Sequence, residues 1–434
     1  MNILLTGLVS VHWGRVEYGN IGNYYIVEVA IRELHRVFPN AEISTTFQMT
    51  EEFSKREKIK VLPLSLYYEW SKSDIPLAMK ELGIATMFSI TGNLYETTPY
   101  IDEVLKSDII IDFSGEMWGD HAEPVGTNRF LVNLIKLRVA QLLDRKTVLL
   151  AGSQGPFNNC PEIDFAKLVF RNFNIVSNRE STSKVLLEMN GFDISRVQNF
   201  TDPAFLFEPA PNNTMKEIYS TEKIHNKTRK TIGFILCGFN MLEGPYDKEP
   251  RRDDEFIQFA EVIEYIINKL GARVVLMSHQ NGFIVRPKFQ LMNGRDYPYA
   301  RQLQDVVNKR GIIENNNLIC INRPYLPKET KAIIGQFDMF VTGRIHGFVA
   351  ATSQFVPTVI ITRGHGGVSH RNIGFARSVG LEEYISNPAN SNDMIQKIGN
   401  CWNNMDQIRK TLKQRIPVVK QTAHACFDSL KTIL

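Results

Sequence analysis

The 434-residue sequence contains no long hydrophobic run, and this absence limits how the chain can meet a membrane. A transmembrane helix needs about 20 consecutive apolar residues. The longest apolar stretch, residues 348–362, is interrupted by Ser353, Gln354 and Pro357. The opening MNILLTGLVS has neither a basic start nor a small-residue cleavage site, so it predicts a β-strand rather than a signal peptide. We therefore expect at most peripheral membrane contact.

Cysteine is also scarce, and the cysteines are far apart in the sequence: Cys160, Cys237, Cys320, Cys401 and Cys426. This spacing indicates neither a zinc motif nor a disulfide framework, and free thiols are typical of a reducing cytosol. Charge of one sign is not concentrated either, because 50 basic and 46 acidic residues are spread along the chain for a net charge of +4. A nucleic-acid surface would need a concentrated basic face. We expect a cytoplasmic protein with no nucleic-acid partner. Location at the inner face of the membrane is an open alternative.

Strand and helix patterns alternate along nearly the whole chain. Hydrophobic residues make up 43% and charged residues 22%, as in an ordinary globular protein. The run DIIIDF at residues 108–113 is almost wholly apolar, which is typical of a strand buried in a parallel sheet. A helical pattern follows at residues 130–143 and another strand at 147–151. This alternation predicts an α/β fold with doubly wound parallel sheets.

The length predicts more than one domain, because a single hydrophobic core seldom serves so many residues. Residues 208–230 are polar, contain two prolines and lack periodicity, so they predict an interdomain linker. We expect Rossmann-like domains at residues 1–207 and 231–385, facing each other across a cleft, and helices at 386–434 that pack back. Ligands of such sheets bind at the carboxyl ends of the strands.

The segment VTGRIHG, residues 341–347, follows a predicted buried strand and begins a helix. Backbone N–H groups at a helix start and the guanidinium of Arg344 together suit a phosphate or carboxylate. His346 can donate a hydrogen bond to a phosphate or act as an acid near neutral pH. The alternative is a structural ion pair for Arg344 and a helix cap for His346.

Four other glycine-rich or polar loops fall at the same predicted edge of the sheets. They are GNIGN (19–23), SGEMWGD (114–120), AGSQGPF (151–157) and SNRES (177–181). Glycine lets the backbone approach a ligand closely, and Trp118 offers a stacking face. GNIGN alone is better explained by a tight turn, and each of the other loops alone could be only a turn between a strand and a helix, whereas their shared position indicates a binding site.

Three further features carry candidate side chains. Asp202 lies in TDPAF and His279 follows a predicted strand, and both positions are often caps or turn residues. The loop RGHGGVSHR, residues 363–371, holds two arginines and two histidines. His365 and His370 lack a third ligand nearby, so we expect an anion-binding loop and no metal site.

Taken together, these motifs resemble the polysaccharide pyruvyl transferase family, in order and over nearly the whole chain. The resemblance rests on G-N-x-G, a D-x-I-I-type strand with its glycine loop, G-x-x-G-P-F, x-R-E-x-x-S, D-P-A-F and R-I-H-G. Arg371 and Phe375 stand where the family has a K-x-x-x-F pattern that helps bind the donor.

The resemblance implies a GT-B-like fold and transfer of pyruvate from phosphoenolpyruvate onto two hydroxyls of a sugar, as a ketal, with release of phosphate. The acceptor would be a precursor of a cell-envelope polysaccharide or glycolipid. No cofactor or metal is implied. The expected site comprises catalytic His346 and Arg344, donor-binding Arg179, Arg371, Gly347 and Arg363, and acceptor-binding Asn20, Gly22, Asn23, Gly115, Glu116 and Asp202.

The sequence departs from the family pattern at three places. Asn23 stands where members often have Asp, SGEMWGD is bulkier and more acidic than expected, and GHGGVSH resembles an insertion. These departures leave open the acceptor sugar, its attachment to a lipid, the ketal regiochemistry and the oligomeric state. Two alternative functions are a GT-B glycosyltransferase that uses a nucleotide sugar and a non-catalytic glycan-binding protein.

Overall fold

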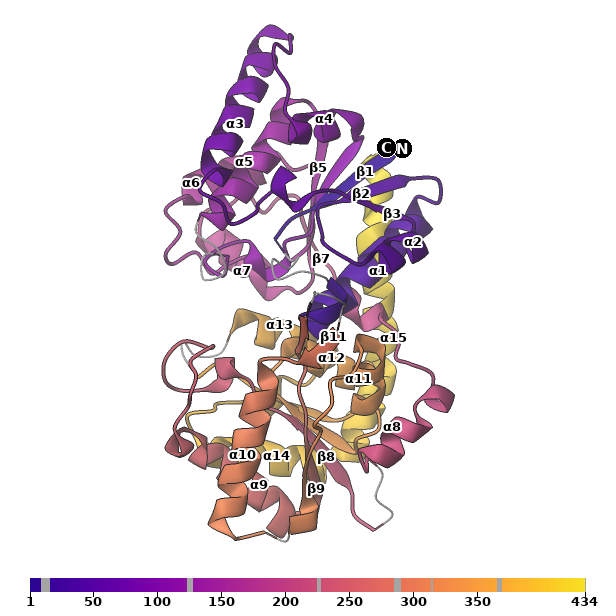
Figure 1. Cartoon of the computed structure of the whole chain (residues 1–434), viewed down its shortest axis with the longest axis vertical. Coiled ribbons are helices and arrows are strands. Elements are labelled where there is room, and N and C mark those ends of the chain that lie inside the picture. The colour runs from indigo at the N-terminus through magenta and orange to yellow at the C-terminus, as the bar shows by residue number, and fades with distance from the viewer. Residues whose placement is uncertain are drawn as a thin grey trace. The chain divides into compact units, whose positions relative to one another are not determined.

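The computed structural model describes residues 1–8, 16–122, 128–224, 228–284, 290–313, 315–364 and 369–433. It confirms the α/β class, with two parallel sheets that each carry helices (Figure 1). The chain forms two compact units. Unit 1 comprises Met1–Val16, Val27–Pro203 and Thr422–Leu434, and unit 2 comprises Glu17–Ile26 and Ala204–Gln421.

The sheet of unit 1 has seven parallel strands in the order β3-β2-β1-β4-β5-β6-β7. The central pair, β1 and β4, aligns Ile3 with Ile109 and Thr6 with Asp112. β4 is wholly buried, as its apolar sequence predicted. The strands are β1 (Asn2–Thr6), β2 (Glu42–Thr45), β3 (Ile59–Val61), β4 (Ile109–Asp112), β5 (Lys146–Gly152), β6 (Ile175–Asn178) and β7 (Val197–Asn199).

Several helices of this half of the chain begin where a cap satisfies free backbone N–H groups. The Thr98 side chain accepts from the Ile101 N–H, and Pro99 follows it at the first helical position. The helices are α1 (Ile21–Val37), α2 (Glu51–Arg56), α3 (Asp74–Thr91), α4 (Pro99–Lys106), α5 (Arg129–Leu142), α6 (Ile163–Phe170) and α7 (Thr182–Met189).

The first long helix begins earlier than its hydrophobic spacing predicted. The helical spacing of Ile26, Val29, Ala30, Leu34 and Val37 predicts a start at Ile26, but α1 begins at Ile21. The side chain of Asn20 accepts a hydrogen bond from the Gly22 N–H (2.9 Å), so Asn20 caps the helix. The expectation of a GNIGN loop is therefore wrong for its last three residues, which form the first turn of α1 and, like the rest of Glu17–Ile26, belong to unit 2.

The sheet of unit 2 has six strands in the order β12-β9-β8-β13-β14-β15, and β10 and β11 form a separate antiparallel hairpin. The predicted strands and helices of this half are present within a few residues. The strands are β8 (Thr231–Ile235), β9 (Arg273–Leu276), β10 (Asn281–Ile284), β11 (Gln290–Asn293), β12 (Leu318–Cys320), β13 (Met339–Thr342), β14 (Thr358–Ile361) and β15 (Ile385–Ser386).

The segment expected to be a linker, residues 208–230, contains a short helix, α8 (Lys216–Thr221), whose Tyr219 hydroxyl donates to the Ala332 carbonyl (3.3 Å). The residues after Pro388 are helical, as predicted. The other helices are α9 (Ile257–Asn268), α10 (Asp296–Arg310), α11 (Pro327–Ile334), α12 (Ile345–Thr352), α13 (His370–Val379), α14 (Ser391–Asn403) and α15 (Met405–Asp428). None of the helices in the described ranges is long and apolar enough to cross a bilayer.

A buried ion pair joins α3 to α5 in unit 1. The Lys136 ammonium lies 2.6 Å from the Glu81 carboxylate, and each side chain is almost fully buried. Lys136 also donates to the Leu66 carbonyl and lies over the ring of Tyr100. Burial lowers the pKa of Lys136, so its charge depends on Glu81.

Lys136→Met should therefore destabilise the protein by about 3–5 kcal/mol, because it leaves the Glu81 carboxylate buried without its cation. The measurement is the free energy of unfolding in urea. Lys80→Met is the matched control, since Lys80 pairs with Glu96 at the surface and should contribute less than about 1 kcal/mol. Equal losses in the two variants would contradict this account.

Candidate functional site

In unit 1, one ion pair joins two of the sequence motifs. The Arg179 guanidinium, after β6, lies 3.0 Å from the Asp202 carboxylate, and both side chains are buried. Arg179 also donates through Nε to the Ser153 hydroxyl (2.9 Å), which follows β5. The motifs R-E-x-x-S, D-P-A-F and G-x-x-G-P-F thus meet at the carboxyl edge of the sheet. The Asp202 carboxylate supports Arg179 there.

The glutamate beside Arg179 has a different task. The buried Glu180 carboxylate accepts from the backbone N–H groups of Thr182 (2.7 Å) and Ser183 (3.1 Å) and from both of their hydroxyls. These contacts cap the start of α7. A Cβ at Gly115 would lie 3.6 Å from the Arg179 guanidinium, in ordinary contact, so the Gly115 backbone faces that cation. The sequence pattern therefore places one buried cation near the backbone of SGEMWGD.

The expected stacking role of Trp118 is wrong. Its indole is fully buried, packs edge-on against Phe130 and donates to the Asp112 carboxylate (2.8 Å). Burial raises the pKa of Asp112 to about 6, although Ser114, Asn133 and Trp118 donate to its carboxylate. Trp118 thus belongs to the core beneath the loop. Glu116 is half-buried, in a single 3₁₀ turn at Gly115–Met117.

In unit 2, a buried asparagine ties together the loops after three neighbouring strands. Asn240, after β8, donates to the carbonyls of Ile361 (3.1 Å), the last residue of β14, and Thr362 (3.0 Å), which follows it. Its Oδ1 accepts from the Cys237 N–H (3.0 Å). A Cβ at Gly343, after β13, would overlap this amide, so only glycine fits there. Asn240 therefore sets the shape of the carboxyl edge.

Arg344 is held by a carboxylate that the sequence reasoning did not identify. Asp296, fully buried at the first position of α10, accepts from Arg344 Nε (3.0 Å) and Nη2. Gln280, after β9, accepts from the same Nη2 (2.8 Å). Burial lowers the pKa of Arg344, but Asp296 outweighs burial and leaves that pKa above its ordinary value. The structural ion pair considered for Arg344 is therefore present, and the two partners fix the plane of the guanidinium.

His346 lies against the first turn of α1. A Cβ at Gly22 would overlap its imidazole, so the glycine of G-N-x-G makes room for this histidine. The ring of Phe375 meets His346 edge-on at 6.4 Å. A second histidine, His279, is buried nearby, and its pKa is lowered well below the ordinary value by burial and then by the charges of His346 and Arg344. His279 is thus neutral at neutral pH.

Two further arginines belong to the same edge. Arg371 is buried near the start of α13, one turn before Phe375, and burial lowers its pKa to about 10. Arg363, after β14, lies over the ring of Phe239 (5.1 Å), as does Arg344 (5.5 Å). Burial also lowers the pKa of Arg363. A bound anion would favour the charged form of both arginines, so this edge suits an anionic ligand.

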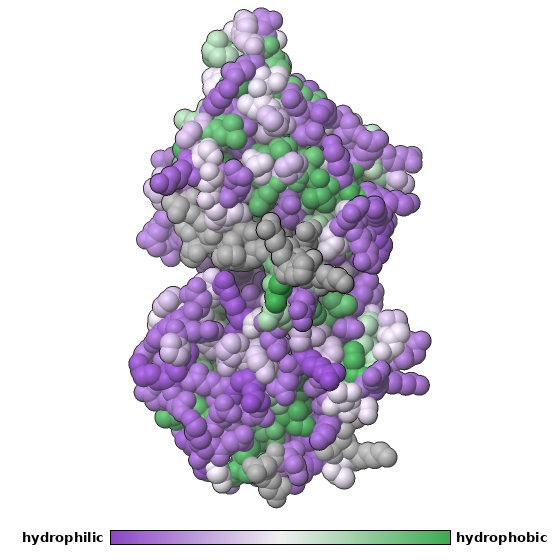
Figure 2. Space-filling view, in the orientation of Figure 1, coloured by the Kyte–Doolittle hydropathy of each residue, from purple (hydrophilic) through white to green (hydrophobic). Residues whose placement is uncertain are grey.

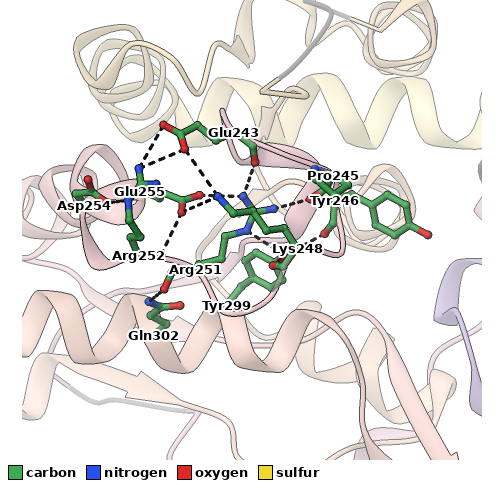
Figure 3. Close-up of polar contacts among 10 residues, drawn as sticks. All are labelled: Glu243, Pro245, Tyr246, Lys248, Arg251, Arg252, Asp254, Glu255, Tyr299 and Gln302. Carbon is green, nitrogen blue, oxygen red and sulfur yellow. Dashed lines mark hydrogen bonds and ion pairs between the residues drawn. The ribbon is translucent and has the colours of Figure 1, made fainter.

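The loop that carries Phe239 is held in place by contacts with Tyr246 and its neighbours. The ring of Tyr246 stacks on Phe239 at 4.5 Å, and the Tyr246 carbonyl accepts from the Tyr299 hydroxyl (3.0 Å). Figure 3 shows Arg251 at the centre of these contacts, where it binds the carbonyls of Glu243 and Pro245 and the carboxylate of Glu255 (2.9 Å). Nothing in the sequence motifs indicated this network.

The structure thus divides the expected site residues between the units. Asn20, Gly22, Asn23, Arg344, His346, Gly347, Arg363 and Arg371 belong to unit 2, and Gly115, Glu116, Arg179 and Asp202 belong to unit 1. Gly347 is buried, and a Cβ there would crowd the Thr342 hydroxyl, so it serves close packing of α12 on β13. The metal interpretation of His365 falls outside the described residues.

The Arg251–Glu255 pair makes a pH-dependent prediction. Burial raises the pKa of Glu255, but hydrogen bonds from Arg251, the Arg252 N–H and Lys248 outweigh burial and lower it to about 2. A carboxyl with a lowered pKa stabilises the fold above its unfolded pKa of about 4.3 and loses that contribution as pH falls toward 2. Glu255→Gln should therefore destabilise the protein strongly at pH 7 and much less near pH 2.

The measurement is the urea midpoint of both proteins across this pH range. Asp254→Asn is the control, because Asp254 pairs with Arg252 at the exposed surface and its loss should change stability little. A gap between wild type and Glu255→Gln that stays constant from pH 7 to pH 2 would rule out this assignment.

Solved structures with a similar fold include a complex with UDP and a complex with UDP-GlcNAc. HepE from Anabaena, in complex with UDP, superimposes with a TM-score of 0.58 at 11% identity, covering 100% of this chain and 98% of HepE. The UDP-GlcNAc 2-epimerase of Neisseria meningitidis, bound to UDP-GlcNAc, gives a TM-score of 0.59 at 10% identity and full coverage of both chains. At such identities, the likeness shows a shared GT-B-like fold.

Sequence relatives are more specific. The amylovoran biosynthesis protein AmsJ of Erwinia amylovora is 22% identical over 418 residues, which cover 92% of this chain and 93% of AmsJ. The family model described as polysaccharide pyruvyl transferase matches residues 20–365, from the cap of α1 to the loop after β14. With that match over most of its length, the chain belongs to the polysaccharide pyruvyl transferase family, and it is a transferase.

Proposed function

We propose that this transferase moves pyruvate from phosphoenolpyruvate onto two hydroxyls of a sugar in a polysaccharide or glycolipid precursor. The observation that carries the proposal is the set of arginines at the carboxyl edge of the unit 2 sheet. Arg344, Arg363 and Arg371 come from three separate segments, after β13, after β14 and at the start of α13. Phosphoenolpyruvate carries a phosphate and a carboxylate, and several guanidinium groups match that pair of anions.

The three arginines would contribute differently to donor binding, because their net charge differs. Asp296 balances Arg344, so Arg344 contributes oriented N–H groups more than net charge. Its Nε and Nη2 serve Asp296 and Gln280, and no hydrogen bond in the described part of the chain uses Nη1, which is left for the donor. Arg371 and Arg363, whose pKa values burial lowers, would bind the phosphate and carboxylate.

The reaction forms two C–O bonds at C2 of the donor and breaks the C–O bond to phosphate. One sugar hydroxyl attacks C2, and a proton is added to the methylene carbon, which becomes a methyl group. The second hydroxyl then attacks C2, phosphate leaves, and the proton of that hydroxyl ends on phosphate. His346 is the candidate to deliver a proton or to hydrogen-bond the departing phosphate. This chemistry requires no metal or cofactor.

The residues proposed for acceptor recognition are glycines and side chains with polar or charged groups. Gly115 and Glu116 lie in the turn after β4, and Asp202 pairs with Arg179, the arginine that the sequence assigns to the donor. Asn20 and Asn23 lie at the start of α1 beside the Gly22–His346 contact. The proposed acceptor is a sugar of a polysaccharide pathway. A free sugar and a lipid-linked sugar both fit this proposal.

Arg371→Met should lower kcat/KM for phosphate release from phosphoenolpyruvate about 10- to 100-fold, because it removes a charged hydrogen-bond donor from the donor site. Phosphate release is measured with a panel of sugar acceptors. Arg377→Met, an exposed arginine on the same helix that pairs with Glu382, is the control and should keep full activity. Arg371→Lys should retain part of the activity, since the family has lysine at this position.

Calorimetry separates this proposal from a nucleotide-sugar transferase of the same fold. We expect the wild-type protein to bind phosphoenolpyruvate and Arg371→Met to bind it more weakly. Tight binding of UDP together with no binding of phosphoenolpyruvate would overturn the proposal.

Asp296→Asn should separate the effect of orienting the Arg344 guanidinium from the effect of the net charge of the donor site. The amide cannot pair with both guanidinium nitrogens as the carboxylate does, so kcat should fall about tenfold or more. The site also becomes more positive, so Kd for phosphoenolpyruvate should not weaken. Asp305→Asn, an exposed carboxylate on the same helix, is the control. A parallel loss of binding and turnover, or an unchanged kcat, would show that Asp296 does not position Arg344.

A further inference from the structure

The second half of α3 carries no charge. Between Glu81 and Glu96 the sequence reads LGIATMFSITGNLY, and the helix ends within it at Thr91, with Gly92 in the left-handed cap position. Figure 1 shows the far end of α3 projecting beyond the other elements of unit 1. Beyond the buried Glu81–Lys136 pair, α3 therefore extends as an uncharged arm.

Three large side chains of this arm are exposed, whereas its other large apolar side chains are partly buried against the unit 1 core. Met87 is 49%, Ile90 75% and Tyr95 72% exposed. Gly83 adds no side chain, and nothing lies within 4 Å of where its Cβ would be. Hydrophobic residues are visible at the projecting end in the space-filling view (Figure 2). Clustered exposed apolar side chains on one segment mark an interaction site more often than scattered ones do.

Several polar groups of the arm form hydrogen bonds within it. The Thr86 hydroxyl donates to the Leu82 carbonyl (2.7 Å), and the Thr91 hydroxyl donates to the Met87 carbonyl (2.8 Å). The Gly92 N–H donates to the Phe88 carbonyl (2.8 Å). Because these groups are bonded internally, moving them out of water costs less than moving unpaired polar groups.

We propose that the exposed side of this arm (residues 82–95), with Met87, Ile90 and Tyr95, inserts into the interfacial region of a lipid bilayer. A stable protein interface needs about 800 Å² from each partner, drawn from 20–30 residues. One helix end about 10 Å wide is too small for that, whereas interfacial segments bury only about 5–10 Å into the headgroup and acyl boundary. Tyr95 supplies the aromatic group that favours this boundary.

The charges at the base of the arm indicate which kind of lipid surface the arm binds. Lys80 and Glu96 form an ion pair there, so the border of the arm is electrically neutral. Attraction to anionic lipid is therefore not required, and apolar burial drives the insertion. The arm should bind neutral phosphatidylcholine with little dependence on salt concentration. This inference is independent of the donor, the acceptor and the proposed reaction.

The test is co-sedimentation of the full chain with phosphatidylcholine vesicles at low and high salt, without substrates. Wild type should bind at both, and Ile90→Glu should lower the partition coefficient at least about tenfold. Met189→Glu is the matched control, because Met189 is 77% exposed on α7 and should retain wild-type binding. Circular dichroism and thermal unfolding check that both variants fold, and Met87→Glu serves as a second arm variant.

Three results would overturn the proposal: no binding by wild type, equal binding by wild type and the arm variants, or binding that high salt abolishes. Sedimentation equilibrium tests the alternative that the arm binds a second copy of the chain. A dimer that forms without vesicles and is lost in Ile90→Glu would assign the arm to a second copy of the chain and likewise overturn the proposal.

Discussion

The pairing of Arg344 with Asp296 is the interaction on which the unit 2 site depends. A buried guanidinium needs a buried carboxylate, and this carboxylate comes from the first residue of a helix distant in sequence. The pair joins the loop after β13 to α10, and Gln280 adds the loop after β9. Asn240 then connects the neighbouring loops after β8 and β14. The proposed site for a small anion is thus shaped mostly by contacts among protein groups, before any ligand binds.

The family motifs are held together by contacts with each other. R-E-x-x-S meets D-P-A-F through the Arg179–Asp202 pair, and its glutamate caps the helix that follows. G-N-x-G meets R-I-H-G where Gly22 makes room for His346. The edge-on contact of Phe375 with His346 joins the Arg371 segment to the same histidine. Motifs that are far apart in the sequence therefore contact one another in pairs in the folded protein.

The sequence predicted most strands and helices because buried parallel strands such as DIIIDF are unmistakably apolar. It also predicted Arg344, His346 and Arg371 as neighbours on one side of the fold. It could not predict Asp296, because a carboxylate at a helix start looks like any capping residue until its distant partner is known. Trp118 was misjudged for the opposite reason, since its neighbours in SGEMWGD are polar while its indole lies in the core. The early start of α1 escaped notice because glycine and asparagine lower helix propensity, whereas the Asn20 cap restores it.

The last described segment has a consequence for how the protein is made. Ala423, Cys426 and Phe427 are fully buried within unit 1, although most of that unit precedes Pro203 in the sequence. Domains usually fold in the order in which the ribosome releases them. Here the earlier unit lacks part of its interior until residues 422–434 have been synthesised, after all of unit 2. Unit 1 therefore stays incomplete during translation, with part of its apolar interior uncovered. It can be completed only after more than two hundred further residues, Ala204 to Gln421, have been synthesised.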